Sequence, residues 1–99
     1  MFDDTTLALG LDRLSNDELL TCTRRLVGCD NQLLAALLAH LGEVEARGIH
    51  RERSCASLYT YCIYELRMSE DRALRRAKAA RVVRRFPATL GAIARGELH

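Results

Sequence analysis

The sequence has little of what marks several large protein classes. Its 99 residues include one proline and six glycines, which excludes a Pro/Gly-rich linker. The longest uninterrupted apolar run, residues 33–39, is far shorter than the ~20 residues that span a bilayer. The first four residues include two aspartates, so they do not form the basic start of a secretory signal. We therefore expect a cytoplasmic protein without a membrane-spanning segment.

The composition that remains is that of an ordinary folded domain. Apolar residues make up 48% and charged residues 28% of the chain, which argues against disorder. The length allows one domain. Apolar residues recur at helical spacing, and no segment alternates as a strand does. We expect a single helical domain over residues 1–99: an all-α, compact bundle of about five helices containing a helix-turn-helix-like pair.

The net charge of +2 conceals a strong asymmetry along the chain. Residues 1–46 hold three arginines and eight acids, a balance of −5, and residues 47–66 balance at +1. Residues 67–99 hold eight arginines, one lysine and three acids, a balance of +6. Such asymmetry suggests a polyanionic partner or a second protein chain. Arginine binds phosphate bidentately, although a GC-rich genome is the simpler explanation for its excess over lysine.

Capping signals divide the N-terminal half into two predicted helices after a loose lead over residues 1–14. Ser15 and Glu18 form a capping box. The helix that they start is predicted to end near Gly28 and to face inward with five side chains: Leu19, Leu20, Thr23, Leu26 and Val27. A second helix, capped by Asp30 or Asn31, carries a leucine-rich stripe and ends at Gly48.

Serine caps also define the C-terminal half, after a short polar connection over residues 49–53. A third helix begins at Ser54 or Ser57 and runs through Leu66. A fourth begins at Ser69, where acids in the first turn suit the helix dipole, and ends near Phe86. Pro87 then starts a last helical segment, which closes at residue 96.

The four cysteines form two pairs, Cys22 with Cys29 and Cys55 with Cys62, each spaced by seven residues. On one helix such a pair lies ~10 Å apart along the axis, too far for a disulfide. We expect buried, reduced, structural cysteines, as in a cytosolic protein. A zinc site between helices is the alternative, but the spacing does not specify one. We predict no metal and no cofactor.

Residues 54–86 have the proportions of a helix-turn-helix, in which the second helix enters the DNA major groove. That helix is predicted to carry the basic side chains that contact DNA, mainly at the phosphate backbone: Arg72, Arg75, Arg76, Lys78, Arg81, Arg84 and Arg85. Three of them, Arg72, Arg75 and Arg76, lie on its N-terminal half, where base edges are reached. An alanine stripe over residues 73–80 would let a neighbouring helix approach closely.

The C-terminal 62 residues also carry a set of motifs: Cys55-Ala56-Ser57-Leu58, Tyr61-Cys62, Leu66-x-Met68-Ser69-Glu70, Ala73, Ala80-Arg81, Phe86-Pro87 and Gly96-Glu97-Leu98-His99. In these motifs the stretch 38–99 resembles the helical region N-terminal to the nuclease domain in bacterial HNH-endonuclease-family proteins, of the myxobacterial and actinobacterial type. The resemblance implies a DNA-related role. In that family further chain follows this point, so we expect an excised domain or a short relative without the nuclease.

The nuclease chemistry itself is missing from the sequence. An HNH module needs a histidine base and metal ligands. The three histidines, His40, His50 and His99, have no Asn or Asp partner at useful spacing. We expect His40 beside the leucine stripe and His50 in a loop. No nucleophile elbow or phosphate-binding loop occurs. We predict that the chain is not an enzyme.

Three functions remain as hypotheses. The first is a small non-catalytic DNA-binding module that acts as a dimer, its basic C-terminal half on DNA. The alternative is a protein-interaction or dimerisation module, in which the acidic half of one chain meets the basic half of another. The third is a segment that folds onto a nuclease domain. No membrane partner is expected.

Overall fold

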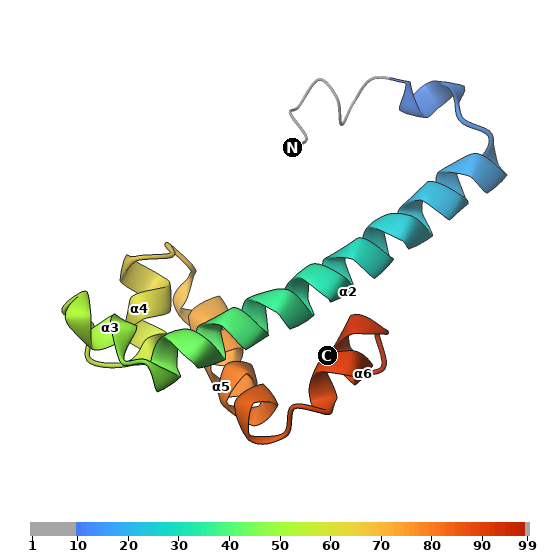
Figure 1. Cartoon of the computed structure of the whole chain (residues 1–99). Coiled ribbons are helices and arrows are strands. Elements are labelled where there is room, and N and C mark those ends of the chain that lie inside the picture. The colour runs from blue at the N-terminus through green and yellow to red at the C-terminus, as the bar shows by residue number, and fades with distance from the viewer. Residues whose placement is uncertain (1–9, 99) are drawn as a thin grey trace.

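Five α-helices and a short 3₁₀ turn make up the part of the chain that the structure describes, residues 10–98 of a computed structural model. Their bounds are η1 Leu11–Arg13, α2 Asn16–Ala46, α3 Ile49–Glu52, α4 Leu58–Tyr64, α5 Glu70–Arg85 and α6 Thr89–Ala94 (Figure 1). These residues contain no strand, so the all-α prediction is confirmed. Of the predicted loose lead, residues 1–9 lie outside the described range, and residues 11–13 form η1.

The longest element, α2, is one continuous helix of 31 residues. The predicted break near Gly28 is therefore wrong, and Asp30 and Asn31 lie inside the helix rather than capping a second one. A lone glycine costs a helix only about 1 kcal/mol. Ending the helix there would leave carbonyl groups unpaired and require a second, costly nucleus. A continuous helix through Gly28 therefore has the lower free energy.

The two ends of α2 are where the sequence placed them. The Ser15 hydroxyl accepts from the Glu18 amide, and the Glu18 carboxylate accepts from the Ser15 amide, both at 3.1 Å. At the other end Gly48 adopts φ 68°, the left-handed conformation that glycine tolerates best. The capping box and the terminal glycine are thus confirmed.

The C-terminal part of α2 and the helices after it form a packed body, here called the head (residues 34–98). α2 packs against α5 and α6, and α4 packs on α5 (Figure 1). The largest fully buried side chains are Leu38, Leu41, Leu58 and Cys62. The predicted alanine stripe lies at the centre of this core, where Ala73, Ala77 and Ala80 are buried.

The N-terminal part of α2, here called the arm (residues 16–33), projects away from the head (Figure 1). The inward orientation predicted for its side chains is wrong. Leu19, Leu20, Leu26 and Val27 are 41–56% exposed, and Thr23 is also exposed. An amphipathic pattern indicates that a face needs an apolar partner, but it does not say whether the partner lies in the same chain.

The arm makes the molecule elongated. The radius of gyration is 16.6 Å and the extents are 49 × 30 × 20 Å. A compact domain of this length has a radius of gyration of about 13 Å. No helix in residues 10–98 is both long enough and apolar enough to cross a membrane.

The helix-turn-helix-like pair forms as predicted from α4, a turn and α5. Ser57, not Ser54, caps α4, and its hydroxyl accepts from the Thr60 amide. Ser69 caps α5 and accepts from the Arg72 amide at 3.2 Å. Within the turn Arg67 takes φ 57°. The chain therefore reverses between two capped helices whose relative placement is fixed by packing.

The segment predicted as a polar connection contains a short helix, α3. His50, expected in a loop, lies on it and is buried. Its backbone carbonyl accepts from the Cys55 amide at 2.9 Å, which ties α3 to the start of the next segment. The connection is thus part of the head, because His50 and Cys55 are buried together.

Candidate nucleic-acid interface

The positions of the buried alanines on α5 show which face of the helix is exposed to solvent. Ala73, Ala77 and Ala80 recur at intervals of four and three residues and are at most 2% exposed. Side chains on the opposite side of the helix therefore point to solvent. These are Asp71, Arg75, Lys78, Val82 and Arg85, at intervals of four and three residues. We call this row the outward face of α5.

Small residues on both helices let α2 come close to α5. A Cβ added at Gly42 would lie 3.4 Å from the carbonyl oxygen of Ala80 and 3.5 Å from Cβ of Arg84. This close approach confirms the role predicted for the alanine stripe. It also brings the carboxylates of α2 within reach of the arginines on the near side of α5.

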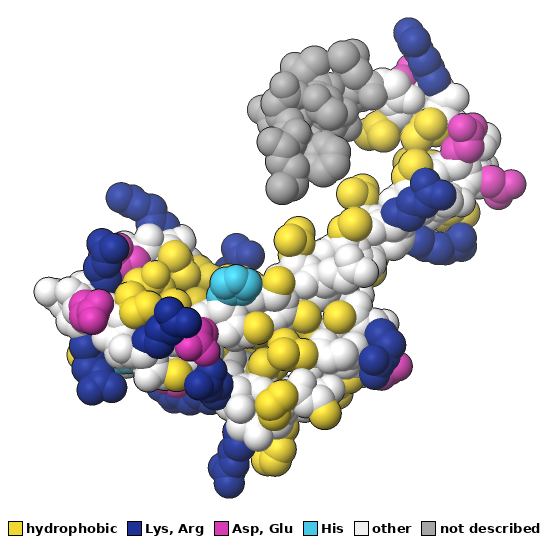
Figure 2. All heavy atoms as spheres, in the orientation of Figure 1, with side chains coloured by type: hydrophobic (Ala, Val, Ile, Leu, Met, Phe, Trp, Pro, Cys, Tyr) yellow, Lys and Arg dark blue, Asp and Glu magenta, His cyan; other side chains and the backbone are white. Residues whose placement is uncertain are grey.

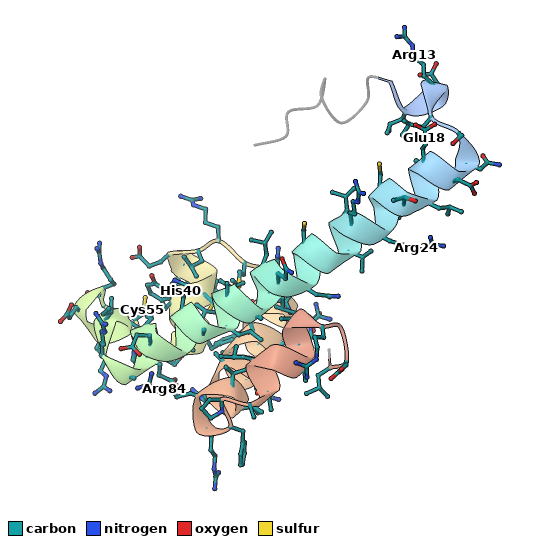
Figure 3. The ribbon with its side chains drawn as sticks, turned by 45° about the vertical axis from the view of Figure 1, so that its right-hand side comes forward. Arg13, Glu18, Arg24, His40, Cys55 and Arg84 are labelled. Carbon is teal, nitrogen blue, oxygen red and sulfur yellow. The ribbon has the colours of Figure 1, made fainter. Side chains whose placement is uncertain are left out.

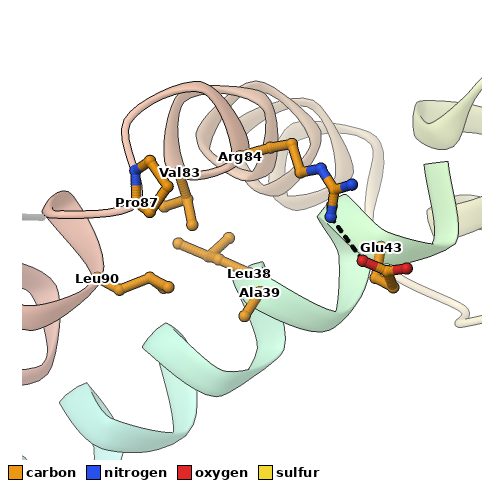
Figure 4. Close-up of a pocket in the computed structure, with 8 residues that line it drawn as sticks. Leu38, Ala39, Glu43, Val83, Arg84, Pro87 and Leu90 are labelled. Carbon is orange, nitrogen blue, oxygen red and sulfur yellow. Dashed lines mark hydrogen bonds and ion pairs between the residues drawn. The ribbon is translucent and has the colours of Figure 1, made fainter. Parts of the chain in front are cut away.

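Two of the seven predicted DNA-contacting residues are held by those carboxylates. Arg81 binds Glu45, with Nη2 3.0 Å from Oε2, and Arg84 binds Glu43, with Nη1 2.5 Å from Oε1 (Figure 4). Hydrogen bonds from Arg47 and then from Arg84 lower the pKa of the Glu43 carboxyl. The hydrogen bond to Glu45 raises the pKa of Arg81. The guanidinium groups of both arginines thus reach toward α2, while each side chain stays 55% exposed.

The same ion pair borders a groove of about 340 Å³ between α2, α5 and the start of α6 (Figure 4). Its lining is largely apolar and includes Leu38, Val83 and Leu90. Glu43 and Arg84 are the charged residues in this lining, and they neutralise each other. The groove therefore presents no activated nucleophile or free general base.

Arg75 is only loosely held. Its Nη2 lies 3.3 Å from Oδ2 of Asp71, one turn earlier, and both side chains are more than 60% exposed. Such an exposed pair within one helix contributes a few tenths of a kcal/mol at most. Arg75 can therefore exchange Asp71 for a phosphate at little cost.

Arg72 and Arg76 form a second cationic group beside the outward face. Arg76 is half-buried, and its Nε has no hydrogen-bond partner within the described range. Burial lowers the pKa of Arg76, the charges of Arg72 and Arg75 act in the same direction, and Asp30 opposes them. An anion at this place would relieve the repulsion among the three arginines.

Lys78 and Arg85 are the most available of the predicted residues. Both are exposed, and within residues 10–98 neither has a carboxylate oxygen within 4.0 Å. The Arg85 guanidinium lies 5.6 Å from the centre of the Phe86 ring, which orients it without neutralising it. The structure thus divides the seven residues into Arg81 and Arg84, which are paired with α2, and five cations that are not, of which Arg76 is half-buried.

The cysteines do not form a metal site. No group of three potential ligands occurs within the described part of the chain. Cys55 and Cys62 are buried and free, as predicted, and burial raises the pKa of the Cys62 thiol. Cys22 and Cys29 are exposed on the arm, so the prediction of burial is wrong for this pair. The reason is the arm itself, because no element within residues 10–98 covers these two positions.

His40 does not take part in a site. It is exposed, and its Nδ1 lies 2.6 Å from the carbonyl oxygen of Ala36 on the same helix (Figure 3). That hydrogen bond is local to α2 and far in the sequence from the cations of α5. The sequence also missed two features: the carboxylates that hold Arg81 and Arg84, and the exposed stripe of the arm. The opposite charges of residues 1–46 and 67–99 could have indicated the first of these, the pairing of carboxylates with Arg81 and Arg84.

Comparisons with family models, with curated proteins and with solved structures find no match for this chain. The resemblance to the HNH-associated helical region therefore stays a prediction. Two structural features therefore point to a function: the exposed cations of α5 and the exposed apolar stripe of α2.

Proposed function

We propose that this chain is a non-catalytic cytoplasmic module that binds DNA through the outward face of α5. The single observation that carries the proposal is the row formed by Arg75, Lys78 and Arg85, opposite the buried alanine stripe. Arg72 and Arg76 lie beside this row, on the first two turns of α5. An exposed helix of this kind, preceded by a capped helix and a turn, is how helix-turn-helix proteins address the major groove.

The expected binding is electrostatic and mainly to phosphates. The five cations that are not paired with α2 would neutralise at most five phosphates, which gives a slope of log K against log salt of roughly −4.5. Such binding is strong at low salt and weakens steeply above physiological ionic strength. Specificity for a sequence would need base contacts, and Arg72 and Arg75 on the first two turns of α5 are the exposed residues placed to make them.

The test compares two variants that lose the same charge. Lys78→Gln with Arg85→Gln removes two accessible cations, whereas Arg81→Gln with Arg84→Gln removes two cations paired to α2. Affinity for a labelled duplex is measured by fluorescence anisotropy between 50 and 300 mM salt. We expect the first variant to weaken binding at least tenfold and to flatten the slope by about 2, and the second to do much less.

Two outcomes would refute the proposal. One is an absence of binding by the natural chain at the lowest salt. The other is an equal loss in both variants, which would mean that total charge rather than the outward face of α5 governs the interaction. Circular dichroism of both variants verifies that helicity is unchanged.

A second candidate function, a protein-association module, is favoured by a different observation. The arm exposes five large aliphatic side chains on a helix that projects from the head. A stripe of this kind on a folded chain marks an interaction surface. Part of the predicted contact between acidic and basic halves is taken up within the chain, where Glu43 and Glu45 bind Arg84 and Arg81. Association would therefore use the apolar stripe.

A further inference from the structure

The arm carries an apolar stripe that nothing in residues 10–98 covers. Its large side chains are Leu19, Leu20, Leu26, Val27 and Leu33, all between 41% and 61% exposed. Yellow side chains follow the arm from its outer end to the head (Figure 2). Glu18 and Arg24 lie on the same segment, well separated from Arg84 in the head (Figure 3).

The stripe repeats every seven residues. Leu19-Leu20, Leu26-Val27 and Leu33-Leu34 are successive pairs at this spacing. A sustained seven-residue apolar repeat is the pattern of a helix that pairs with another helix in a left-handed coiled coil. The row through Leu20, Val27 and Leu34 continues to Leu41, which is 2% exposed in the head. The stripe thus continues a packed surface beyond the point where residues 34–98 supply a partner.

We propose that the arm of a second copy of this chain covers the stripe, so that the protein forms an antiparallel two-stranded coiled coil over residues 16–33. This inference rests on the second candidate function, association, and is independent of DNA binding. It names the partner, the segment and the orientation.

Charge decides the orientation. Asp30 lies within the stripe, between Leu26 and Leu33, and is exposed. A parallel pair in register would place Asp30 against Asp30 of the other copy, which is repulsive. An antiparallel pair centred between residues 24 and 25 places Asp30 opposite Leu19 and Thr23 opposite Leu26. It also puts the two heads at opposite ends of the paired arms.

The size of the contact favours a weak, reversible association. A helix of 18 residues is about 27 Å long. Two such helices bury on the order of 1,000 Å² in total, at the low end of specific interfaces. We therefore expect a reversible dimer that appears as the concentration is raised.

Sedimentation measures the association directly. Leu19→Glu with Leu26→Glu places two charges in the stripe, and glutamate keeps the helix propensity high. The matched control, Thr21→Glu with Gln32→Glu, adds the same charges on the opposite face of the arm. We expect the natural chain and the control to dimerise between 1 μM and 1 mM, and the stripe variant to stay monomeric with unchanged unfolding of the head.

The salt dependence of dimerisation distinguishes this apolar interface from one between the acidic half of one chain and the basic half of another. Because the stripe is apolar, the dissociation constant should change less than threefold between 150 and 500 mM salt. A natural chain that is monomeric at 1 mM, whether because its own first nine residues or another protein covers the stripe, overturns the proposal. Equal dissociation of the stripe variant and the control, or a dimer lost at high salt, overturns it as well.

The exposed cysteines report the orientation. Cys22 and Cys29 flank the stripe on the same side of the arm. In the antiparallel pair Cys22 of one copy lies near Cys29 of the other. Cys22→Ser and Cys29→Ser, mixed and treated with a short bis-maleimide, should therefore cross-link at least fivefold more than either alone. Cross-linking of each variant with itself, without the mixed product, would show a parallel pair and refute the antiparallel dimer.

Discussion

At the scale of single residues, arginines of similar sequence context differ in what they can do. Arg84 and Arg85 are neighbours, yet Arg84 is bound to Glu43 and Arg85 faces solvent over Phe86. The difference follows from the 100° between successive residues of a helix, which turns one side chain toward α2 and the next one away. Availability for a phosphate is therefore a property of the helix face, not of the residue type.

The pKa of Glu43 measures how strongly the neighbouring arginines bind its carboxylate. Hydrogen bonds from Arg47 and Arg84 lower the pKa of its carboxyl, and the one from Arg47 is the larger cause. We expect Arg47→Gln and Arg84→Gln each to raise the pKa of Glu43, as followed by NMR titration of the side-chain carboxyl. A carboxyl with a lowered folded pKa stabilises the fold above its unfolded pKa, and that stabilisation is lost as the pH falls through the folded value. A pKa of Glu43 that stays the same in either variant would contradict the geometry.

Gly42 lies where α2 and α5 approach each other closely, so the size of the side chain at this position affects their packing. A Cβ at this position makes ordinary contact with Ala80 and Arg84, so Gly42→Ala should be tolerated. Gly42→Leu must push the two helices apart, and we expect it to lower the free energy of unfolding by about 1–3 kcal/mol. Urea denaturation measures the change.

Gly28 serves as the control, because a Cβ there meets nothing within 4 Å. Gly28→Ala should leave the head unchanged and stabilise the arm helix by roughly 0.5–1 kcal/mol, seen as slower amide hydrogen exchange. A loss of stability at Gly28 as well as at Gly42 would show that the contact between α2 and α5 is not the cause of the effect.

At the scale of elements, the sequence predicts local structure well and long-range structure poorly. The caps at Ser15 and Ser69 and the turn between α4 and α5 depend on neighbouring residues, and each is where the sequence placed it. Continuity through Gly28 depends instead on comparing two costs, a single glycine in a helix against a second nucleation. The residues around Gly28 do not by themselves show which of these two costs is larger.

The candidate site follows the same division. The basic residues of α5 and the alanines behind them are evident from spacing alone. The pairing of Arg81 with Glu45 spans 36 residues, and it depends on how α2 crosses α5. Likewise, the exposure of Leu26 depends on where the head ends, which the spacing of leucines does not encode. Contacts distant in the sequence are what pattern reasoning could not supply.

The cap of α4 gives a test of a choice that the sequence left open. Ser57, rather than Ser54, accepts from the Thr60 amide. We expect Ser57→Ala to reduce the free energy of unfolding by about 1 kcal/mol, because a first-turn amide loses its acceptor. Ser54→Ala should change it by less than about 0.5 kcal/mol. Thermal or urea unfolding distinguishes the two variants, and an equal cost at both positions would contradict the capping assignment.

At the scale of the whole molecule, the charge asymmetry is partly neutralised inside the fold. Glu43 and Glu45 at the end of α2 meet Arg84 and Arg81 of α5, so the acidic and basic segments are joined in one chain. Arg75, Lys78 and Arg85 lie on the outward face of α5, and the row of exposed aliphatic side chains lies on the arm. The basic row and the apolar stripe thus lie on two different parts of the molecule, head and arm.

This separation predicts that the head folds without the arm. All buried residues of the described chain lie between Ala35 and Ile93. Removing residues 1–30 keeps this core, and it keeps Asn31, which lies against Gly96. We expect the shortened chain to unfold cooperatively, with a urea dependence close to that of the full chain, because the surface buried by the head is the same. Its melting temperature should not depend on protein concentration, whereas that of the full chain should rise with concentration as the arms pair. A shortened chain that unfolds without a cooperative transition would show that the arm contributes to the core.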